Sequence, residues 1–212
     1  NSALYFDSYI GTWNMSSVES TSNMFNGCQL FNEYIGGWDM SNVLSIDSMF
    51  QGATSFNQDI SGWDTSSLLQ MDGVFQGATS FNQDISGWDM SNVLQMDSVF
   101  YNATSFNQDI NGWNVSAATS MYNTFTNATS FNQNLGGWDV SNVLYMLGML
   151  DDCGIDQNNY DNILIGWCAL TLTNGVQLGV SGMTYSDDPC PAYSARTYMI
   201  SNLAWGFFGD SA

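Results

Sequence analysis

Tryptophan recurs at an invariant spacing through most of this chain. The positions are Trp13, Trp38, Trp63, Trp88, Trp113 and Trp138, each 25 residues after the one before (38 − 13 = 25, and so on to 138 − 113 = 25). A fixed period of this length is typical of a solenoid, whose copies stack because one copy cannot bury its apolar side alone. No insertion breaks the period across the six copies, as expected when stacked backbones share one hydrogen-bond register.

The apolar positions inside one copy predict its local structure. Val43, Ile46 and Phe50 have helical spacing, which predicts a short helix over residues 42–50. Gly52 follows, at a slot that we expect to adopt a left-handed φ. The segment 56–63 predicts one short parallel strand per coil. Because neighbouring strands lie ~4.8 Å apart, the copies predict a rod roughly 30 Å long.

The period ends after Asp151, where the composition changes. We therefore expect an α/β repeat solenoid over residues 1–150 and a C-terminal α+β cap over 151–212 that covers the last coil. Residues 160–167 and 192–203 predict helices in this cap, and 175–182 predicts a short hairpin-like extended piece.

The charge balance restricts the partners. The chain has 20 acidic residues and one basic residue, Arg196, with a net charge of −19. Nucleic acid and anionic membrane surfaces are excluded as partners because nothing is present to neutralise phosphates. No apolar run approaches ~20 residues, so no membrane insertion is expected. No signal peptide is recognisable, and we expect a mature chain whose leader has been removed. Cations, neutral glycans and other proteins remain as partners.

Arg196 and the cysteines each carry a structural expectation. We expect Arg196 to form a salt bridge inside the cap, with Asp187, Asp188 or Asp161. Cys28 and Cys153 occupy the same repeat slot five coils apart, which is too far for a disulfide within one molecule. Cys168 and Cys190 share the tail and are the favoured disulfide, with Cys153 as the competing partner.

Aspartates recur at three repeat positions, which we call acidic columns. The columns are Asp39, Asp64, Asp89 and Asp139; Asp59, Asp84 and Asp109; and Asp47, Asp72 and Asp97. Like charges ~4.8 Å apart repel unless they are hydrogen-bonded or bridged by a cation. Carboxylate oxygens suit calcium, and we name Asp59, Asp84 and Asp109 as the candidate ligands. The alternative is that these side chains cap turns within their own coil.

Aromatic residues and sequons leave two further alternatives open. The tryptophans and phenylalanines fit a stacked core, and the alternative is a surface tryptophan row that stacks on sugar rings. Four Asn-x-Ser/Thr sequons begin at Asn14, Asn102, Asn114 and Asn127 and are candidate N-glycosylation sites. Asn102 and Asn127 stand in the slot of Gly52, so a simple turn residue is the alternative there.

The repeat also resembles a known family. The copy FNQDISGWDMSNVLQMDSVFYNA, residues 81–103, resembles the BspA-like leucine-rich-repeat surface proteins of the 25-residue subtype. The tail segments NYDNILIGW, LGVSGMTYS and SARTYMI resemble the segment that closes such arrays. The resemblance implies a right-handed, leucine-rich-repeat-like stack, a secreted or cell-surface location, adhesion or an envelope role, and no known catalytic residues.

The function class follows from these features. An enzyme is not expected, because the chain has no His or Lys and a uniform rod repeats identical acids instead of placing one pair in distinct environments. The sequence predicts a non-enzymatic extracellular structural or adhesive protein, with glycosylation and head-to-tail filaments as further expectations. The alternative is an extracellular module that binds a glycan or host protein along one face of the rod, assisted by calcium.

Overall fold

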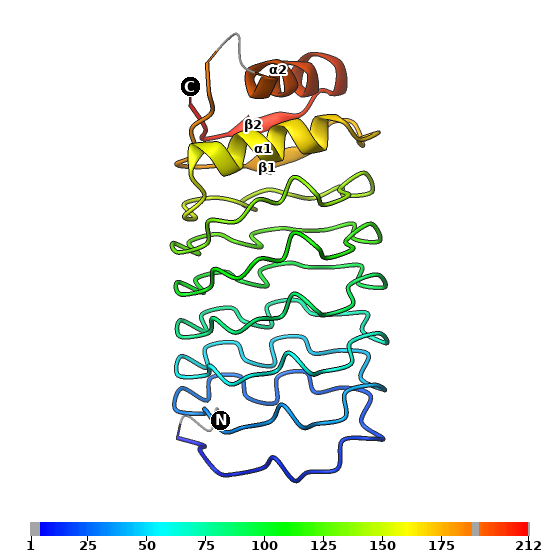
Figure 1. The fold of residues 1–212 in the computed structure, drawn as a ribbon, viewed down its shortest axis with the longest axis vertical. Coiled ribbons are helices and arrows are strands. Elements are labelled where there is room, and N and C mark those ends of the chain that lie inside the picture. The colour runs from blue at the N-terminus through cyan, green and yellow to red at the C-terminus, as the bar shows by residue number, and fades with distance from the viewer. Residues whose placement is uncertain (1–4, 188–190, 212) are drawn as a thin grey trace.

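The rod consists of stacked coils with a helical cap at one end. The structure is a computed structural model that describes residues 5–187 and 191–211. Single parallel bridges join equivalent residues of six consecutive coils: Ser20, Ser45, Gln70, Gln95, Ser120 and Tyr145. Figure 1 shows the coils stacked along the long axis, with the first coil at the opposite end from the helices.

Each coil is a succession of β-turns. In the second coil, Met49 N–H donates to Ile46 O (3.0 Å) and Ala53 N–H donates to Phe50 O (3.0 Å). These are bonds to the third residue back, and no helix is present among the described coil residues. The helix predicted over residues 42–50 is therefore wrong. Ser48 and Gly52 interrupt helical geometry, since both have positive φ (53° and 68°).

Alternate N–H groups of a coil donate to the next coil instead of to their own. Ile46 N–H donates to Gln70 O (3.0 Å), Ser48 N–H to Asp72 O (2.7 Å) and Phe50 N–H to Val74 O (2.9 Å). Inter-coil pairing thus lies along residues 45–52 and their equivalents. The strand predicted over 56–63 is wrong, because that segment is described without a strand and the bridges lie at Ser45 instead.

One repeat slot at the end of the inter-coil segment requires a left-handed backbone. The slot of Gly52 also holds Gly27, Gly77, Asn102, Asn127 and Asp152, and all six have φ between 53° and 73°. Glycine, asparagine and aspartate adopt this region at the lowest cost, which explains why the slot holds these residue types. The prediction of a left-handed φ at this slot is confirmed.

Aromatic side chains fill the inside of every coil. Phe50 stacks on Phe56 of its own coil at 3.9 Å between ring centroids, and on Phe75 of the next coil at 5.7 Å. Trp63 and Trp88 stack at 5.9 Å, and both are buried. Trp63 Nε1 donates to Ile35 O of the preceding coil (3.1 Å), so the indole also satisfies a backbone acceptor. The core interpretation of Trp38 to Trp138 is confirmed, whereas Trp13 of the first coil is half exposed.

Amide side chains tie the outer turns of successive coils together. Asn57 N–H donates to Asn32 Oδ1 (2.9 Å), and Asn82 N–H donates to Asn57 Oδ1 in the same way (2.9 Å). Gln83 Nε2 donates to Asn57 Oδ1 as well (3.0 Å). Because a buried or stacked backbone N–H needs an acceptor, this column of asparagines holds the turns in register.

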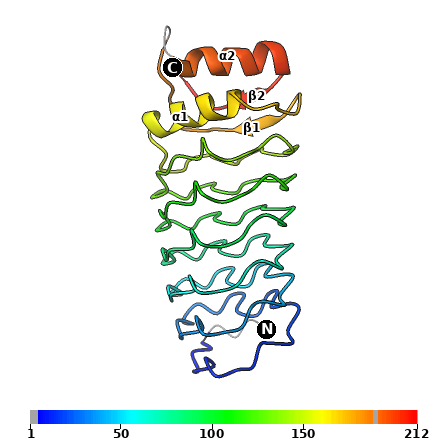
Figure 2. The ribbon, with the colours of Figure 1, turned by 45° about the vertical axis from the view of Figure 1, so that its right-hand side comes forward.

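The cap contains the helices and strands of the described chain: α1 (Gln157–Cys168), β1 (Gln177–Gly179), α2 (Pro191–Leu203) and β2 (Gly206–Phe208). Both predicted helices are confirmed. The hairpin-like expectation for 175–182 is wrong, because β1 pairs in parallel with β2, which follows α2. A parallel pair requires a crossover, and α2 provides it. Figure 2 shows α1 and α2 stacked one above the other at the end of the rod.

Helix α1 takes the place of a coil segment. Asp156 is its N-cap, and its side chain accepts from Asn159 N–H. Asp156 N–H donates to Asn132 Oδ1 (2.9 Å), which continues the asparagine column into the cap. Trp167 Nε1 donates to Leu135 O (3.0 Å), as the coil tryptophans do one coil earlier. The cap is therefore built as modified coils in which a helix replaces the first part.

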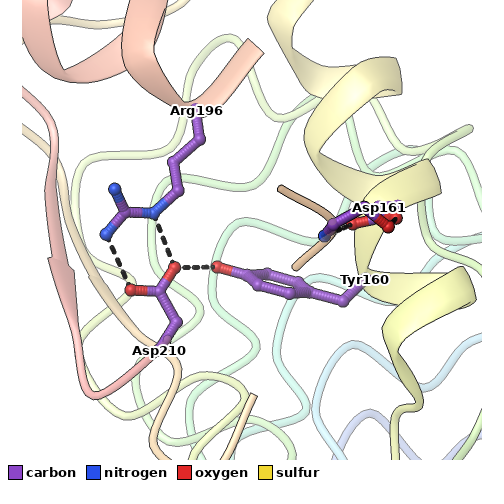
Figure 3. Close-up of polar contacts among 5 residues, drawn as sticks. Tyr160, Asp161, Arg196 and Asp210 are labelled. Atoms are coloured by element: carbon purple, nitrogen blue, oxygen red, sulfur yellow. Dashed lines mark hydrogen bonds and ion pairs between the residues drawn. The ribbon is translucent and has the colours of Figure 1, made fainter. Parts of the chain in front are cut away.

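The single basic side chain closes the cap (Figure 3). Arg196 on α2 donates to both carboxylate oxygens of Asp210, at 2.7 Å each. Tyr160 OH on α1 donates to the same carboxylate (2.8 Å), and Asp210 is almost fully buried. The expectation of a salt bridge inside the cap is confirmed, but its partner is Asp210. Asp161 accepts from Ser186 instead, and Asp188 lies outside the described residues.

Candidate functional site: a groove along the rod

One apolar column points outward along the rod. Val43 and Leu44 are adjacent, and in extended backbone neighbouring side chains point to opposite sides. Val43 is buried, whereas Leu44 is 39% exposed, and the equivalent leucines are exposed by 42–52%. This leucine column consists of Leu44, Leu69, Leu94 and Leu144. Thr119 takes its place in the fifth coil and Glu19 in the first.

A continuous groove follows the leucine column. Its central part, of about 490 Å³, is lined by Leu44, Leu69, Leu94, Gln70, Gln95 and Thr119. Leu44 is shared with a neighbouring cavity that contains Glu19. Gln95 and Thr119 are shared with a cavity that leads to Tyr122 and Tyr145, and these tyrosines line a further cavity with Leu144 and Leu147. The groove thus spans five coil steps, roughly 24 Å.

The acidic column Asp47, Asp72 and Asp97 runs beside the leucines. Asp47 Oδ1 accepts from Asp72 N–H (2.9 Å), and Asp72 Oδ1 accepts from Asp97 N–H (2.9 Å). Asp97 Oδ1 accepts from Tyr122 N–H (2.8 Å) and lines the groove. These carboxylates therefore fix the coil register at the side of the groove.

Asp72 has an unusual proton affinity. Burial raises the pKa of Asp72 to about 6. The hydrogen bond from Asp97 N–H lowers this pKa, and the negative charges of Asp97 and Asp47 raise it further. An ionised carboxylate is costly when it is removed from water and flanked by like charges. The Asp72 side chain consequently gains or loses its charge near pH 6.

The proposed calcium ligands cap turns. Asp59 Oδ1 accepts from Ser61 N–H (2.9 Å) and Ser61 Oγ (2.7 Å), Asp84 from Ser86 N–H (2.9 Å), and Asp109 from Asn111 N–H (3.0 Å). The hydrogen bonds from Ser61 and Ser86 lower the pKa of Asp59 and Asp84. Among the described residues, no three His, Cys, Asp or Glu side chains gather closely enough to hold a metal ion. Turn capping is what the contacts show, and calcium binding stays a prediction.

The sequons fall into two structural classes. Asn14 and Asn114 are exposed, and each side-chain oxygen accepts from the serine two residues later, Ser16 (2.8 Å) or Ser116 (2.7 Å). Asn102 and Asn127 are half-buried in the left-handed slot, with φ of 56° and 58°. The turn role of these two is observed. Glycosylation stays a prediction at all four positions.

The cysteines form no disulfide among the described residues. Cys28 is buried in the slot that alanines hold in the middle coils, and Cys153 is half-buried in the same slot. Burial raises the pKa of the Cys153 thiol to about 12, so it is protonated at neutral pH. Cys168 lies beside α2 and shares an apolar cleft with Pro191. Its predicted partner, Cys190, lies outside the described residues, so this disulfide stays a prediction.

Sequence reasoning missed the leucine column. The helix assumed over 42–50 absorbed Val43 into the core and left Leu44 without a role. A usable signal was present, since two adjacent apolar residues cannot both face inward from extended backbone. The recurrence of a second apolar residue after Val43 and its equivalents in four of the six copies, at Leu44, Leu69, Leu94 and Leu144, therefore indicated an exposed apolar row.

No helix of the described residues is long and apolar enough to cross a membrane. Comparison with the curated proteins found no significant match, and comparison with the solved structures found none either. One family model matches the chain twice, over residues 1–97 and 61–163, and so covers the coils and the start of the cap. The chain belongs to the family described as Mycoplasma protein of unknown function, DUF285.

Proposed function

We propose that this chain is a non-enzymatic adhesive repeat protein of the cell surface or the extracellular space, and that it binds its partner along the groove. The groove carries the proposal. It presents four exposed leucines in one row, beside hydrogen-bonding side chains such as Gln70 and Gln95. Contiguous exposed apolar surface with a polar border marks interaction sites in soluble proteins.

The core does not need these leucines. Each coil is already filled by stacked phenylalanine and tryptophan, and Val43 provides the inward contact at this point of the second coil. An exposed leucine costs solubility without adding to the core, so its repetition indicates a function outside the coil. This argument favours the binding module over a purely structural rod.

The extracellular assignment rests on the resemblance of the repeat to BspA-like leucine-rich-repeat surface proteins. We extend that resemblance to the right-handed course of the coils and to the α/β leucine-rich-repeat class. The described coils use turns and single bridges where that class uses strands and helices, so membership in the class is a proposal and not an observation.

Head-to-tail filaments need two complementary surfaces, one at each end of the stack, and they stay a prediction. Trp13 in the first described coil is half exposed, and α2 covers the stack on the opposite side. Negative-stain images at high protein concentration test this prediction, because a regular end-to-end array would support filaments and isolated rods would remove them.

Location is tested on intact cells. Antibodies raised against the folded chain should label non-permeabilised cells that produce it, or detect it in the medium. Labelling that requires permeabilisation would remove the extracellular part of the proposal. A digest of the native protein by mass spectrometry tests the sequons at the same time, since occupied sites add glycan mass at Asn14, Asn102, Asn114 or Asn127.

Adhesion is tested with protein-coated beads on surfaces of gelatin, mucin, cellulose and chitin. The variant Leu69→Ser/Leu94→Ser should lose whatever adhesion the wild type shows, because it removes the centre of the leucine column. Leu30→Ser is the matched control, since Leu30 is equally exposed (49%) and does not line the groove. Equal loss in both variants, or retention in both, would contradict binding along the groove.

A further inference from the structure

The charge of the groove restricts what can enter it. Neither acid lines the central part of the groove: Glu19 lines the adjoining cavity at one end with Leu44, and Asp97 lines the adjoining cavity at the other end with Gln95. The one basic side chain of the sequence, Arg196, is held by Asp210 in the cap. No basic side chain therefore neutralises Glu19 or Asp97, and a partner that buries these acids must supply positive charge.

The apolar side of the groove adds a second condition. Leu44, Leu69 and Leu94 form an uninterrupted row on consecutive coils. Covering this row with apolar groups is favourable, because it removes the leucine side chains from water. A partner must therefore present apolar side chains next to positive ones, which describes a basic amphipathic segment.

The spacing of the coils favours a helix over an extended chain. Successive coils lie ~4.8 Å apart, and an α-helix laid along the rod presents its apolar face every turn, about 5.4 Å. Over the two coil steps from Leu44 to Leu94, the helical pitch and the coil spacing differ by only ~1.2 Å in total. An extended chain presents one face every ~6.7 Å and diverges by ~4 Å over the same steps.

We propose that the groove binds a basic amphipathic helix of a partner protein, with apolar side chains on Leu44, Leu69 and Leu94 in its central part and Lys or Arg beside Glu19 and Asp97 in the cavities that adjoin it. The proposal rests on the proposed function of the groove and specifies its partner. Two features of the groove support it independently: the apolar row and the acids that no basic residue of the chain balances. Tyr122 and Tyr145 offer rings to a sugar, so a glycan is the competing outcome of the test.

The test uses the full-length chain and a labelled synthetic peptide of about 18 residues, or five helical turns, made of Leu and Lys with helical periodicity. A scrambled peptide of the same composition and a periodic Leu/Glu peptide are the controls. Fluorescence anisotropy should show binding of the periodic Leu/Lys peptide at least roughly tenfold tighter than of the scrambled one. The Leu/Glu peptide should not bind, because its charge has the sign of the groove.

Variants locate the binding. Leu69→Ser/Leu94→Ser and, separately, Glu19→Gln/Asp97→Asn should each weaken binding roughly tenfold. The amide that replaces the Asp97 carboxylate keeps an oxygen for Tyr122 N–H, so the second variant changes charge without removing that contact. Leu30→Ser should bind as the wild type does. Circular dichroism and thermal melts of every variant show whether it is folded.

Each outcome decides the proposal. Equal binding of the periodic and scrambled peptides, or loss in Leu30→Ser, would overturn it, as would binding unchanged by both groove variants. Peptide binding that fails while adhesion of coated beads still depends on Leu69 and Leu94 would leave the groove as the binding site and remove the helical partner. Adhesion only to mucin, cellulose or chitin in that case would identify the glycan alternative.

Discussion

The coils and the cap occupy successive positions of one stack, yet they satisfy their backbones differently. A coil is made of turns, and groups such as Ile46 N–H find their acceptor only in the next coil. Helix α1 bonds its own backbone and still places Trp167 and Asn159 where the coil side chains would lie. The difference teaches how such a stack can end: a segment that needs no further neighbour replaces the turns.

The two regions also manage charge differently. The coil acids are held by hydrogen bonds from backbone N–H and Ser hydroxyl groups, as Asp59 is by Ser61. The cap buries Asp210 and gives it the one basic side chain of the sequence, together with Tyr160. Burial in the cap therefore requires an ion pair, whereas the exposed coil acids do not need one. Four predictions, each with a control variant, test the comparison between the coils and the cap.

The largest effect is expected in the aromatic stack of the coils. Phe75→Ala removes a fully buried ring that contacts Phe50, Phe81 and Phe100 at centroid distances of 5.7, 3.9 and 5.7 Å. We expect the free energy of unfolding to fall by about 3–5 kcal/mol, since the deletion leaves a cavity. Urea unfolding followed by tryptophan fluorescence measures it.

Phe208→Ala is the matched control for this prediction, because Phe208 in β2 is half exposed. Its cost should stay below ~1 kcal/mol. Since each coil contacts only its neighbours, Phe75→Ala should also broaden the transition or divide it into two. Equal costs at both positions would contradict the stacked core.

Breaking the ion pair should destabilise the cap. Arg196→Met leaves the buried carboxylate of Asp210 with Tyr160 as its remaining partner, at an expected cost of about 3 kcal/mol. Hydrogen exchange should become faster in α1 and α2, with little change in the first coils. Asn202→Ala on α2 is the control, since Asn202 is exposed. Faster exchange throughout the rod would show that the cap and the coils unfold together.

Glycines with positive φ should tolerate an added methyl group less well than a glycine without it. Gly77 has φ of +69° and an added Cβ would meet nothing closer than 3.8 Å, so Gly77→Ala costs only backbone strain, about 1–2 kcal/mol. Gly182 in the cap, with φ of +80°, should respond similarly, because it has the same backbone strain and only Asp152 Oδ1, at 3.4 Å, lies within 4 Å of its added Cβ. Gly87→Ala is the control and should be neutral, since nothing lies within 4 Å of its added Cβ. Thermal melts measure the set, and a neutral Gly77→Ala would contradict the turn assignment.

The smallest effect concerns the pH dependence of Asp72. Its pKa of about 6 lies above that of the unfolded chain, so the folded state binds more protons between about pH 4 and 6. The contribution of Asp72 to the free energy of unfolding therefore falls as pH rises from about 4 to 6. Asp72→Asn should be more stable than wild type above pH 6, by about 1 kcal/mol after allowance for solvent at a half-exposed site, and equal to it below pH 4.

Asp64→Asn is the control for the pH series. Hydrogen bonds from Ser66 lower the pKa of Asp64, so removing its charge should give no gain above pH 6. Urea midpoints for both variants and the wild type across the pH range measure the difference. A gain of the same size in Asp64→Asn would indicate general charge repulsion instead of the burial of Asp72.

Features with a regular spacing could be predicted from the sequence. The burial of Trp38 to Trp138 and the left-handed slot of Gly52 recur every 25 residues, and both cap helices have a helical spacing of apolar residues. The helix over 42–50 was predicted wrongly, because the same apolar spacing fits consecutive turns whose N–H groups bond to the next coil. Spacing in sequence does not say which acceptor an N–H group will find.

The candidate site shows the same limit. The acids of the columns were visible, but whether Asp59 binds a cation or caps a turn depends on the position of Ser61 in space. The leucine column was present in the sequence and was not recognised, because it lay within a segment assigned to a helix. The partner of Arg196 was missed because Asp210 is brought to it by the return of β2 alongside β1.

By itself the sequence determined that this protein is a stack of equal coils with an aromatic interior, closed by a different segment. A strict period and a constant set of inward residues leave no other way to bury so many rings. The tertiary structure decided that the coils are turns, that the leucines line a groove, and that one arginine locks the cap. These features depend on contacts between residues about 25 or more positions apart, or across the cap, which only the folded chain brings together.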